Sequence, residues 1–375
     1  MYFRLLFGLI ILLLPLPVRA SGYSDFNLAI TAFNHGDLLE AEKRATAALG
    51  ASDFPQALRA PAYQLRGDAY FLRNRDADAL ADYNLSLQLA PDLEGSRLRR
   101  GALHVVRADY AAALDDFDAL IVARPHYPLG YAGRGGVFEA QKRFDLAIAE
   151  YGRMLKMSGK TAQGYLLRGY SYRSIGKLND ALSDFDDAVD LEPSRARGYL
   201  LRGLVYQDKL DFERALKEFQ TAASHDPVDF NPRFEVGITL WQLSRFEESE
   251  QALAALLRKK PDNEPTRLWL HLARLRSDQN AVIDATGVDA KKWPGALFGL
   301  FQGKATVQEA RAAAALTPEG EREMHICEAV FYGAEMTLTK SPSENVIPLL
   351  EDAAKNCPLD SIERNSARAE LERLR

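Results

Sequence analysis

The chain has 375 residues, enough for two or three ordinary domains or for one long repeat array. Apolar residues make up 47% and charged residues 26%, a balance that excludes global disorder. The net charge is −5 with both signs interspersed, which argues against a nucleic-acid binder, because phosphate binding needs a concentrated basic surface. Only two cysteines and six scattered histidines are present, so we expect no metal centre and no cofactor.

Residues 1–20 predict an export signal. Arg4 precedes an apolar run of roughly 14 residues, shorter than the about 20 that a helix needs to span a bilayer. Small residues in Val18-Arg19-Ala20 predict cleavage after Ala20, and a retained anchor or a buried helix is the alternative. No cysteine precedes position 327, so we expect no lipid attachment. The mature chain should be soluble, periplasmic or secreted, and without an integral membrane span.

A 34-residue period organises the middle of the chain. Residues 21–59 predict one degenerate repeat, and residues 60–263 predict six regular repeats. Glycine recurs every 34 residues, at Gly67, Gly101, Gly135, Gly169, Gly203 and Gly237. Small residues follow in step at Ala79, Ala113, Ala147, Ala181, Ala215 and Ser249, and proline closes the repeats at Pro91, Pro125, Pro193, Pro227 and Pro261.

This period, with an aromatic residue near its 24th position, resembles the tetratricopeptide repeat. The resemblance implies an all-α fold, a right-handed α-solenoid of helix hairpins. Proline after each second helix should end that helix, because proline lacks an N–H group. The hairpins must stack on one another, since no single hairpin can bury its apolar face alone.

Five successive repeats carry an arginine at the 7th position and a carboxylate at the 23rd. A ladder that binds phosphate is one interpretation of the arginines. Both residue types disappear together in the next repeat, where Val236 and Ala252 stand, and this paired loss favours ion pairs between helices. We therefore predict structural ion pairs between Arg66, Arg100, Arg134, Arg168, Arg202 and the carboxylates Asp82, Asp116, Glu150, Asp184, Glu218.

The inner face of the array is the predicted binding surface. In tetratricopeptide arrays, four positions of each first helix line a concave groove, and here many of them are apolar or aromatic. Apolar residues at solvent-facing positions indicate that something covers them. We predict a protein-binding groove for an extended or helical peptide, formed by Phe71, Tyr170, Arg173, Gln207, Phe234 and Trp241. The alternative is that the C-terminal part of the chain itself fills the groove.

Residues 264–375 predict a degenerate repeat followed by a C-terminal helical region. An apolar patch at 293–303 precedes a capping-box pattern at 306–309, then a helix containing Phe331-Tyr332-Gly333 and a charged final helix. This order resembles the bacterial lipoprotein NlpI family. The resemblance implies a periplasmic scaffold that binds envelope proteases and peptidoglycan hydrolases, with homodimers in some members. This chain departs from the family because it lacks the lipid-attachment cysteine.

The two cysteines predict a disulfide. We expect Cys327 to begin the first helix of the final hairpin and Cys357 to end its second helix. Antiparallel helices of equal length would bring these ends together, and an oxidising compartment would join the thiols. The alternative is two cysteines buried separately as small apolar side chains.

These observations predict a non-catalytic adaptor or scaffold of the cell envelope, linking an envelope protease to peptidoglycan-modifying substrates by the family resemblance. Its partners should be other proteins and not nucleic acid. Two alternatives remain: a self-assembling structural protein, and a hydrolase built on the helical array. For the hydrolase, Asp68 and Glu139 are the acids placed in the groove, two repeats apart.

Overall fold

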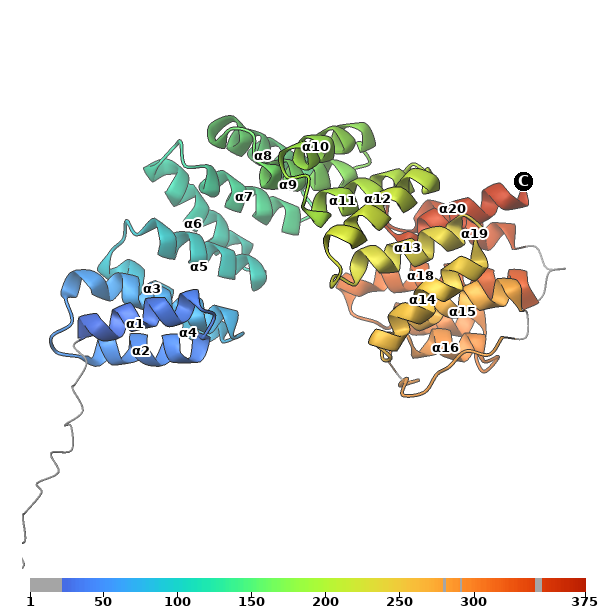
Figure 1. The fold of residues 1–375 in the computed structure, drawn as a ribbon, viewed down its shortest axis with the longest axis horizontal. Coiled ribbons are helices and arrows are strands. Elements are labelled where there is room, and N and C mark those ends of the chain that lie inside the picture. Colours follow the sequence, from blue (N-terminus) through green and yellow to red (C-terminus); the bar gives the residue numbers. More distant parts are fainter. Residues whose placement is uncertain (1–21, 279–280, 291, 341–345) are drawn as a thin grey trace, which may run out of the picture. The chain divides into compact units, whose positions relative to one another are not determined.

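The computed structural model describes residues 22–278, 281–290, 292–340 and 346–375, and every regular element in these ranges is a helix (Figure 1). The predicted all-α class is therefore confirmed. The expected export signal at 1–20 lies outside the described residues. Within the described ranges, no helix combines the length and apolarity that a membrane span requires. The chain divides into two compact units, 1–140 and 141–375, and each is described by itself.

The first unit is a series of helix hairpins. Helices α1 and α2, α3 and α4, and α5 and α6 pack against each other in pairs, and α7 packs on α6. The helices are α1 (Gly22–Asn34), α2 (Leu38–Gly50), α3 (Gln56–Leu72), α4 (Asp76–Leu89), α5 (Glu94–Val106), α6 (Tyr110–Ala123) and α7 (Pro128–Ala140).

The second unit continues with hairpins and ends in a group of C-terminal helices. The repeat helices are α8 (Phe144–Ser158), α9 (Ala162–Ser174), α10 (Leu178–Leu191), α11 (Ala196–Asp208), α12 (Phe212–His225), α13 (Asn231–Gln242) and α14 (Phe246–Lys259). They are followed by α15 (Glu264–Ser277), α16 (Gly295–Phe301), α17 (Val307–Ala315), α18 (Glu319–Lys340), α19 (Ile347–Asn356) and α20 (Ile362–Leu374). One large apolar core joins the last repeats to these helices, from Ile238 to Leu371.

The repeating glycines allow the two helices of one hairpin to approach closely. A Cβ atom on Gly67 would lie 2.8 Å from the ring of Tyr83, and one on Gly203 would lie 2.6 Å from the ring of Phe219. These distances are shorter than real Cβ contacts, so a larger residue would push the hairpin apart. The aromatic residue near the 24th position therefore packs on the glycine of its own repeat.

A left-handed backbone residue recurs in the turn between the first and second helices. Its φ lies between 58° and 74° in six successive repeats, and glycine occupies this place only at Gly176 among the six. The six residues are Asn74, Ala108, Lys142, Gly176, Leu210 and Ser244. The chain reverses direction here through a conformation that costs an L-residue roughly 1–2 kcal/mol.

The C-terminal helices differ from the expected hairpin of equal helices. Helix α18 has 22 residues, so Cys327 lies within it and not at its start. Helix α19 has 10 residues, and Cys357 is the residue that caps its end. The expectation that Cys327 begins a helix was wrong, because the helix extends upstream to Glu319.

Candidate functional site

Four of the five arginine–carboxylate pairs are present, each joining the two helices of one repeat. The pairs are Arg66–Asp82 at 2.7 Å, Arg100–Asp116 at 2.7 Å, Arg168–Asp184 at 2.7 Å and Arg202–Glu218 at 2.8 Å. The fifth pair, Arg134 with Glu150, would join the two separately described units and stays a prediction.

The same arginines also contact the preceding repeat. Arg100 donates to Asn84 at 2.7 Å, Arg134 to Asp118 at 2.6 Å, and Arg202 to Asp186 at 2.8 Å. Each contact spans 16 residues backwards along the chain. The guanidinium groups are therefore structural links within and between repeats.

Helix α20 lies against the inner face of the second unit, beside α13 (Figure 1). Asn365 of α20 donates to Asp208 at 2.8 Å, and Ser366 accepts from Gln242 at 2.9 Å. Arg373 donates to the carbonyl oxygen of Trp241 at 2.8 Å. The chain's own helix thus covers this part of the predicted groove.

Three predicted groove residues are consequently unavailable to a partner. Trp241 is 0% exposed, Gln207 is 1% exposed and Arg173 is 6% exposed. Arg173 is held by Asp208 at 2.6 Å, and Gln207 donates to Gln242 at 3.0 Å. Their assignment to a protein-binding groove was wrong, because contacts within the second unit bury all three side chains.

The other three predicted groove residues are half-buried. Phe71 of α3 packs against the small core of Ala79, Tyr83 and Leu103 in the first unit. Tyr170 of α9 packs against a core formed by α9, α10 and α11 in the second unit. Phe234 of α13 lines two cavities, and the one that carries four carboxyl groups is the candidate site.

We call this cavity the acidic pocket. It has a volume of about 450 Å³ and is formed by α13, α15, the segment before α16, α18 and the start of α20. Aromatic rings of Phe234, Trp269, Trp293 and Tyr332 line it. Its carboxyl groups belong to Glu264, Glu328, Asp360 and Glu363.

Two contacts hold the tryptophan at the rim of the acidic pocket. Trp293 donates through Nε1 to Glu328 at 2.6 Å. Its ring stacks on His325, with centroids 4.9 Å apart and planes inclined by 25°. The hydrogen bond and the stack fix the direction in which the indole faces the cavity.

Burial shifts the titration of the acidic pocket. Desolvation, with the nearby charge of Glu328, raises the pKa of Glu363 to about 8. Burial also raises the pKa of Glu328, although its hydrogen bond from Trp293 acts in the opposite direction. The two carboxyl groups interact, and both favour the proton-bound form more than an exposed glutamate does.

The disulfide lies beside the acidic pocket. Cys327 and Cys357 are joined, with Cα atoms 5.2 Å apart. The Cys327 sulfur lies 3.8 Å from the hydroxyl of Ser361, which caps the N-terminus of α20 and lines the pocket. The bond therefore ties α18 to the segment that carries Asp360 and Glu363.

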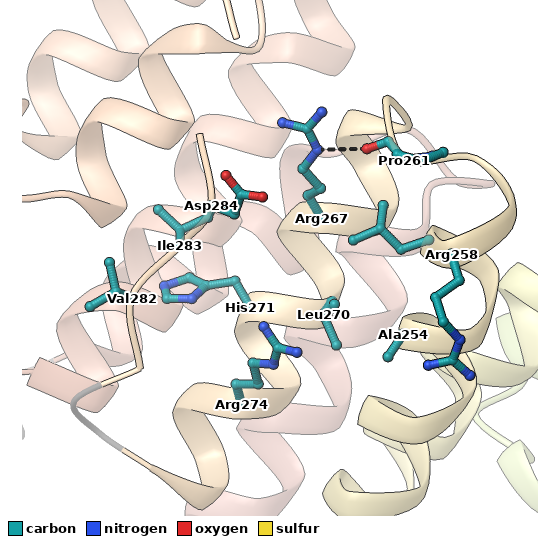
Figure 2. A pocket seen from close by; sticks show the side chains of 11 residues that line it. Ala254, Arg258, Pro261, Arg267, Leu270, His271, Arg274, Val282, Ile283 and Asp284 are labelled. Atoms are coloured by element: carbon teal, nitrogen blue, oxygen red, sulfur yellow. Dashed lines mark hydrogen bonds between the residues drawn. The ribbon is translucent and has the colours of Figure 1, made fainter. Parts of the chain in front are cut away.

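A second cavity, of about 380 Å³, has basic walls (Figure 2). Arg267 and Arg274 face it from α15, together with His271. Arg267 donates to the carbonyl oxygens of Pro261 and Thr286, and Arg274 pairs with Glu250 at 3.0 Å. Burial lowers the pKa of His271 to about 4, so its imidazole is neutral at pH 7. Arg267 and Arg274 already have partners within the chain.

In the described part of the chain, no group of three or more histidine, cysteine or carboxylate side chains is arranged to hold a metal ion. Sequence reasoning missed Glu328 and Glu363, which stand outside the 34-residue period. They meet only because α20 folds back onto α18, and nothing in the spacing of the residues indicates that contact.

The paired helices define an α-solenoid. One family model for the tetratricopeptide repeat matches residues 26–94, 98–162 and 200–264, and a second matches residues 162–195. Together the two models cover more than half of the chain. The chain belongs to the tetratricopeptide repeat family.

Solved structures of other proteins are similar to this chain at low sequence identity. A tetratricopeptide repeat protein of Parabacteroides merdae has 16% identity and a TM-score of 0.55, over 68% of this chain and 98% of its own. A thermophilic repeat protein of Thermus thermophilus has 18% identity and a TM-score of 0.44, over 48% and 99%. MamA from Desulfovibrio magneticus has 20% identity and a TM-score of 0.40, over 46% and 97%. No curated protein matches the chain.

Proposed function

We propose that this protein is a non-catalytic scaffold of the bacterial cell envelope that binds another protein. Tetratricopeptide arrays bind proteins on surfaces formed by successive repeats, which supports the general class. The observation that carries the proposal is the acidic pocket, which is open beside Phe234, whereas α20 contacts Asp208, Trp241 and Gln242.

The proposed location is the periplasm. The apolar run and small residues at 1–20 support export, as argued from the sequence. The disulfide between Cys327 and Cys357 supports the same location, because structural disulfides persist in oxidising compartments. Determining the N-terminal residue of the exported chain tests this, since cleavage after Ala20 should leave Ser21 first.

The proposed partner class follows the resemblance to the NlpI family. The order of C-terminal motifs, from Trp293 to the final helix, supports an envelope protease or a peptidoglycan hydrolase as partner. A homodimer, as in some members of that family, is part of the same proposal. Light scattering of the purified chain measures the dimer directly.

Site-specific photocrosslinking tests the scaffold proposal. A benzophenone amino acid replaces Phe234 at the acidic pocket, and in a matched control it replaces Leu316, which is 87% exposed. Illumination of cells should give discrete adducts from position 234 that are absent from position 316. Identical adducts at both positions would overturn the proposal, and adducts of the chain with itself alone would establish the self-assembling alternative.

One observation favours a second candidate, hydrolysis of a glycan. Glu328 and Glu363 are interacting carboxyl groups with raised pKa, and glycosidases use such groups as acid and nucleophile or base. Release of reducing sugar from peptidoglycan by the wild-type protein, lost in Glu363→Gln, would establish this candidate. No turnover by the wild-type protein would eliminate it.

A further inference from the structure

Glu363 carries a buried carboxyl group that has no cationic partner among the described residues. The residue is 6% exposed, and no described side chain forms an ion pair or a hydrogen bond with its carboxyl group. A buried carboxylate without donors costs several kcal/mol, so native proteins normally supply them. In the isolated chain Glu363 avoids that cost by keeping its proton, and a cation in the cavity would let it ionise.

Two arginines of the second unit are already engaged in ion pairs. Arg173 pairs with Asp208 at 2.6 Å. Arg276 pairs with Glu335 at 3.0 Å and with Glu370 at 2.6 Å. A cation that neutralises Glu363 and Glu328 has to come from outside these pairs.

The aromatic walls of the acidic pocket suit the same kind of ligand. The rings of Trp293, Phe234 and Tyr332 border the cavity that the carboxyl groups enter. Tryptophan faces attract ammonium and guanidinium groups, and the attraction grows when water is excluded. Rings and carboxyl groups in one cavity fit a cation with an apolar stem better than a small inorganic ion.

We propose that the acidic pocket binds a cationic side chain, the guanidinium of arginine or the ammonium of lysine, presented by the partner polypeptide. The cavity of about 450 Å³ has room for such a side chain. Glu363 and Glu328 accept its N–H groups, while Trp293 packs against its stem. The cation site itself does not depend on the proposed scaffold function; only the source of the side chain, a partner polypeptide, rests on it.

Each pocket residue then has a distinct task. Glu363 releases its proton to solvent when the cation enters, and the resulting carboxylate accepts the N–H groups of the cation. Glu328 supplies a second carboxylate and also orients Trp293 through the 2.6 Å hydrogen bond. The disulfide at Cys327 and Cys357 holds the start of α20, and with it Glu363, in place.

Titration of the full chain with N-acetyl-arginine amide tests the proposal, with N-acetyl-lysine amide alongside. The readout is the indole N–H region of an NMR spectrum, which holds three signals because the chain has three tryptophans. Trp293→Phe assigns the signal of Trp293. The uncharged analogue N-acetyl-citrulline amide, which has the shape of the arginine compound, is the ligand control.

The expected result is a saturable shift of the Trp293 signal with a cationic amide and not with citrulline. Glu363→Gln should weaken that binding about ten- to hundred-fold, because it removes a charge-assisted hydrogen bond worth about 1.5–3 kcal/mol. Glu372→Gln, on the exposed face of the same helix, should bind as wild type. Glu328→Gln provides a second loss variant that does not depend on the folding of Glu363→Gln.

Equal responses to arginine and citrulline, or no Trp293 response to either cation at tens of millimolar, would overturn the proposal. Tight binding of spermidine with no response to an arginine- or lysine-containing peptide would refute the claim that the cation belongs to a polypeptide. The scaffold function is tested separately by crosslinking. A cation response without crosslinked partners would therefore refute the scaffold and retain the cation site.

Discussion

Replacing Glu363 with glutamine should stabilise the second unit at alkaline pH and leave its stability nearly unchanged at pH 4. Burial raises the pKa of Glu363 from 4.5 to about 8, and the residue is 6% exposed. Each pH unit of difference between the folded and unfolded pKa is worth about 1.4 kcal/mol, so the raised pKa of Glu363 corresponds to about 5 kcal/mol of unfolding free energy. Glutamine keeps the shape of the protonated acid without ionising, so the variant should recover most of this energy.

The sign follows from proton binding. Between pH 4.5 and pH 8 the unfolded chain has lost the proton of Glu363 while the folded chain retains it. Stability therefore falls as pH rises through this window, and the loss is complete above the folded pKa. Other titratable groups face Glu363 from α13, α15, α18 and the segment before α20: Glu235, Glu264, His325, Glu328, Tyr332 and Asp360.

Urea unfolding at pH 4, 7 and 9 measures the effect. Tryptophan fluorescence reports on the second unit alone, because Trp241, Trp269 and Trp293 all lie within residues 141–375. The difference between Glu363→Gln and wild type should grow with pH, whereas Glu372→Gln should follow wild type. Parallel profiles of Glu363→Gln and wild type would refute the argument that a buried proton stabilises the unit.

Three further changes should alter stability in stated directions. Arg168→Met should cost about 2–3 kcal/mol in urea unfolding, because Asp184 has a side chain only 4% exposed and would lose its partner. Ala108→Gly should stabilise the first unit by about 0.5–1 kcal/mol in thermal unfolding, because φ there is 58°. Replacing Cys327 and Cys357 together with serine should cost roughly 3–4 kcal/mol, from the entropy of a closed loop with a sequence separation of 30.

Each change has an internal control. Arg195→Met removes an exposed pair with Glu192 and should cost about 0.5 kcal/mol or less. Gly176→Ala, at φ 74°, should destabilise, opposite to Ala108→Gly. Reduction of the wild-type protein should reproduce the double-serine loss, and an unchanged midpoint after reduction would contradict the disulfide argument.

The repeat array was predictable because its contacts are local. The close approach of Gly67 to Tyr83 joins neighbouring helices, and the same spacing recurs in each repeat, so the period reveals the packing. The 16-residue separation of Arg66 and Asp82 is visible in the same way. Because the same spacing occurs in several repeats of one sequence, it can be recognised without other sequences.

The site was not predictable in the same way. Trp241 occupies a position that faces the groove in the repeat pattern, yet α20 covers it. Glu328 and Glu363 each occur once, in helices without repeat spacing, so no internal copy reveals their contact. The left-handed turn residue Leu210 was missed for another reason: its side chain carries no preference for that conformation.

Helix α20 folds back onto the inner face, and its contacts join residues that lie far apart in the sequence. The regular repeats need no contacts of this kind. Asn365 meets Asp208 across 157 residues, and Asp360 meets Arg173 across 187. Closing such long loops slows folding, whereas hairpins that contact only their neighbours form quickly. A growing chain that ends before Ile362 therefore lacks the α20 partners of Asp208 and Gln242. These contacts of the second unit can form only after residues 362–374 have been synthesised.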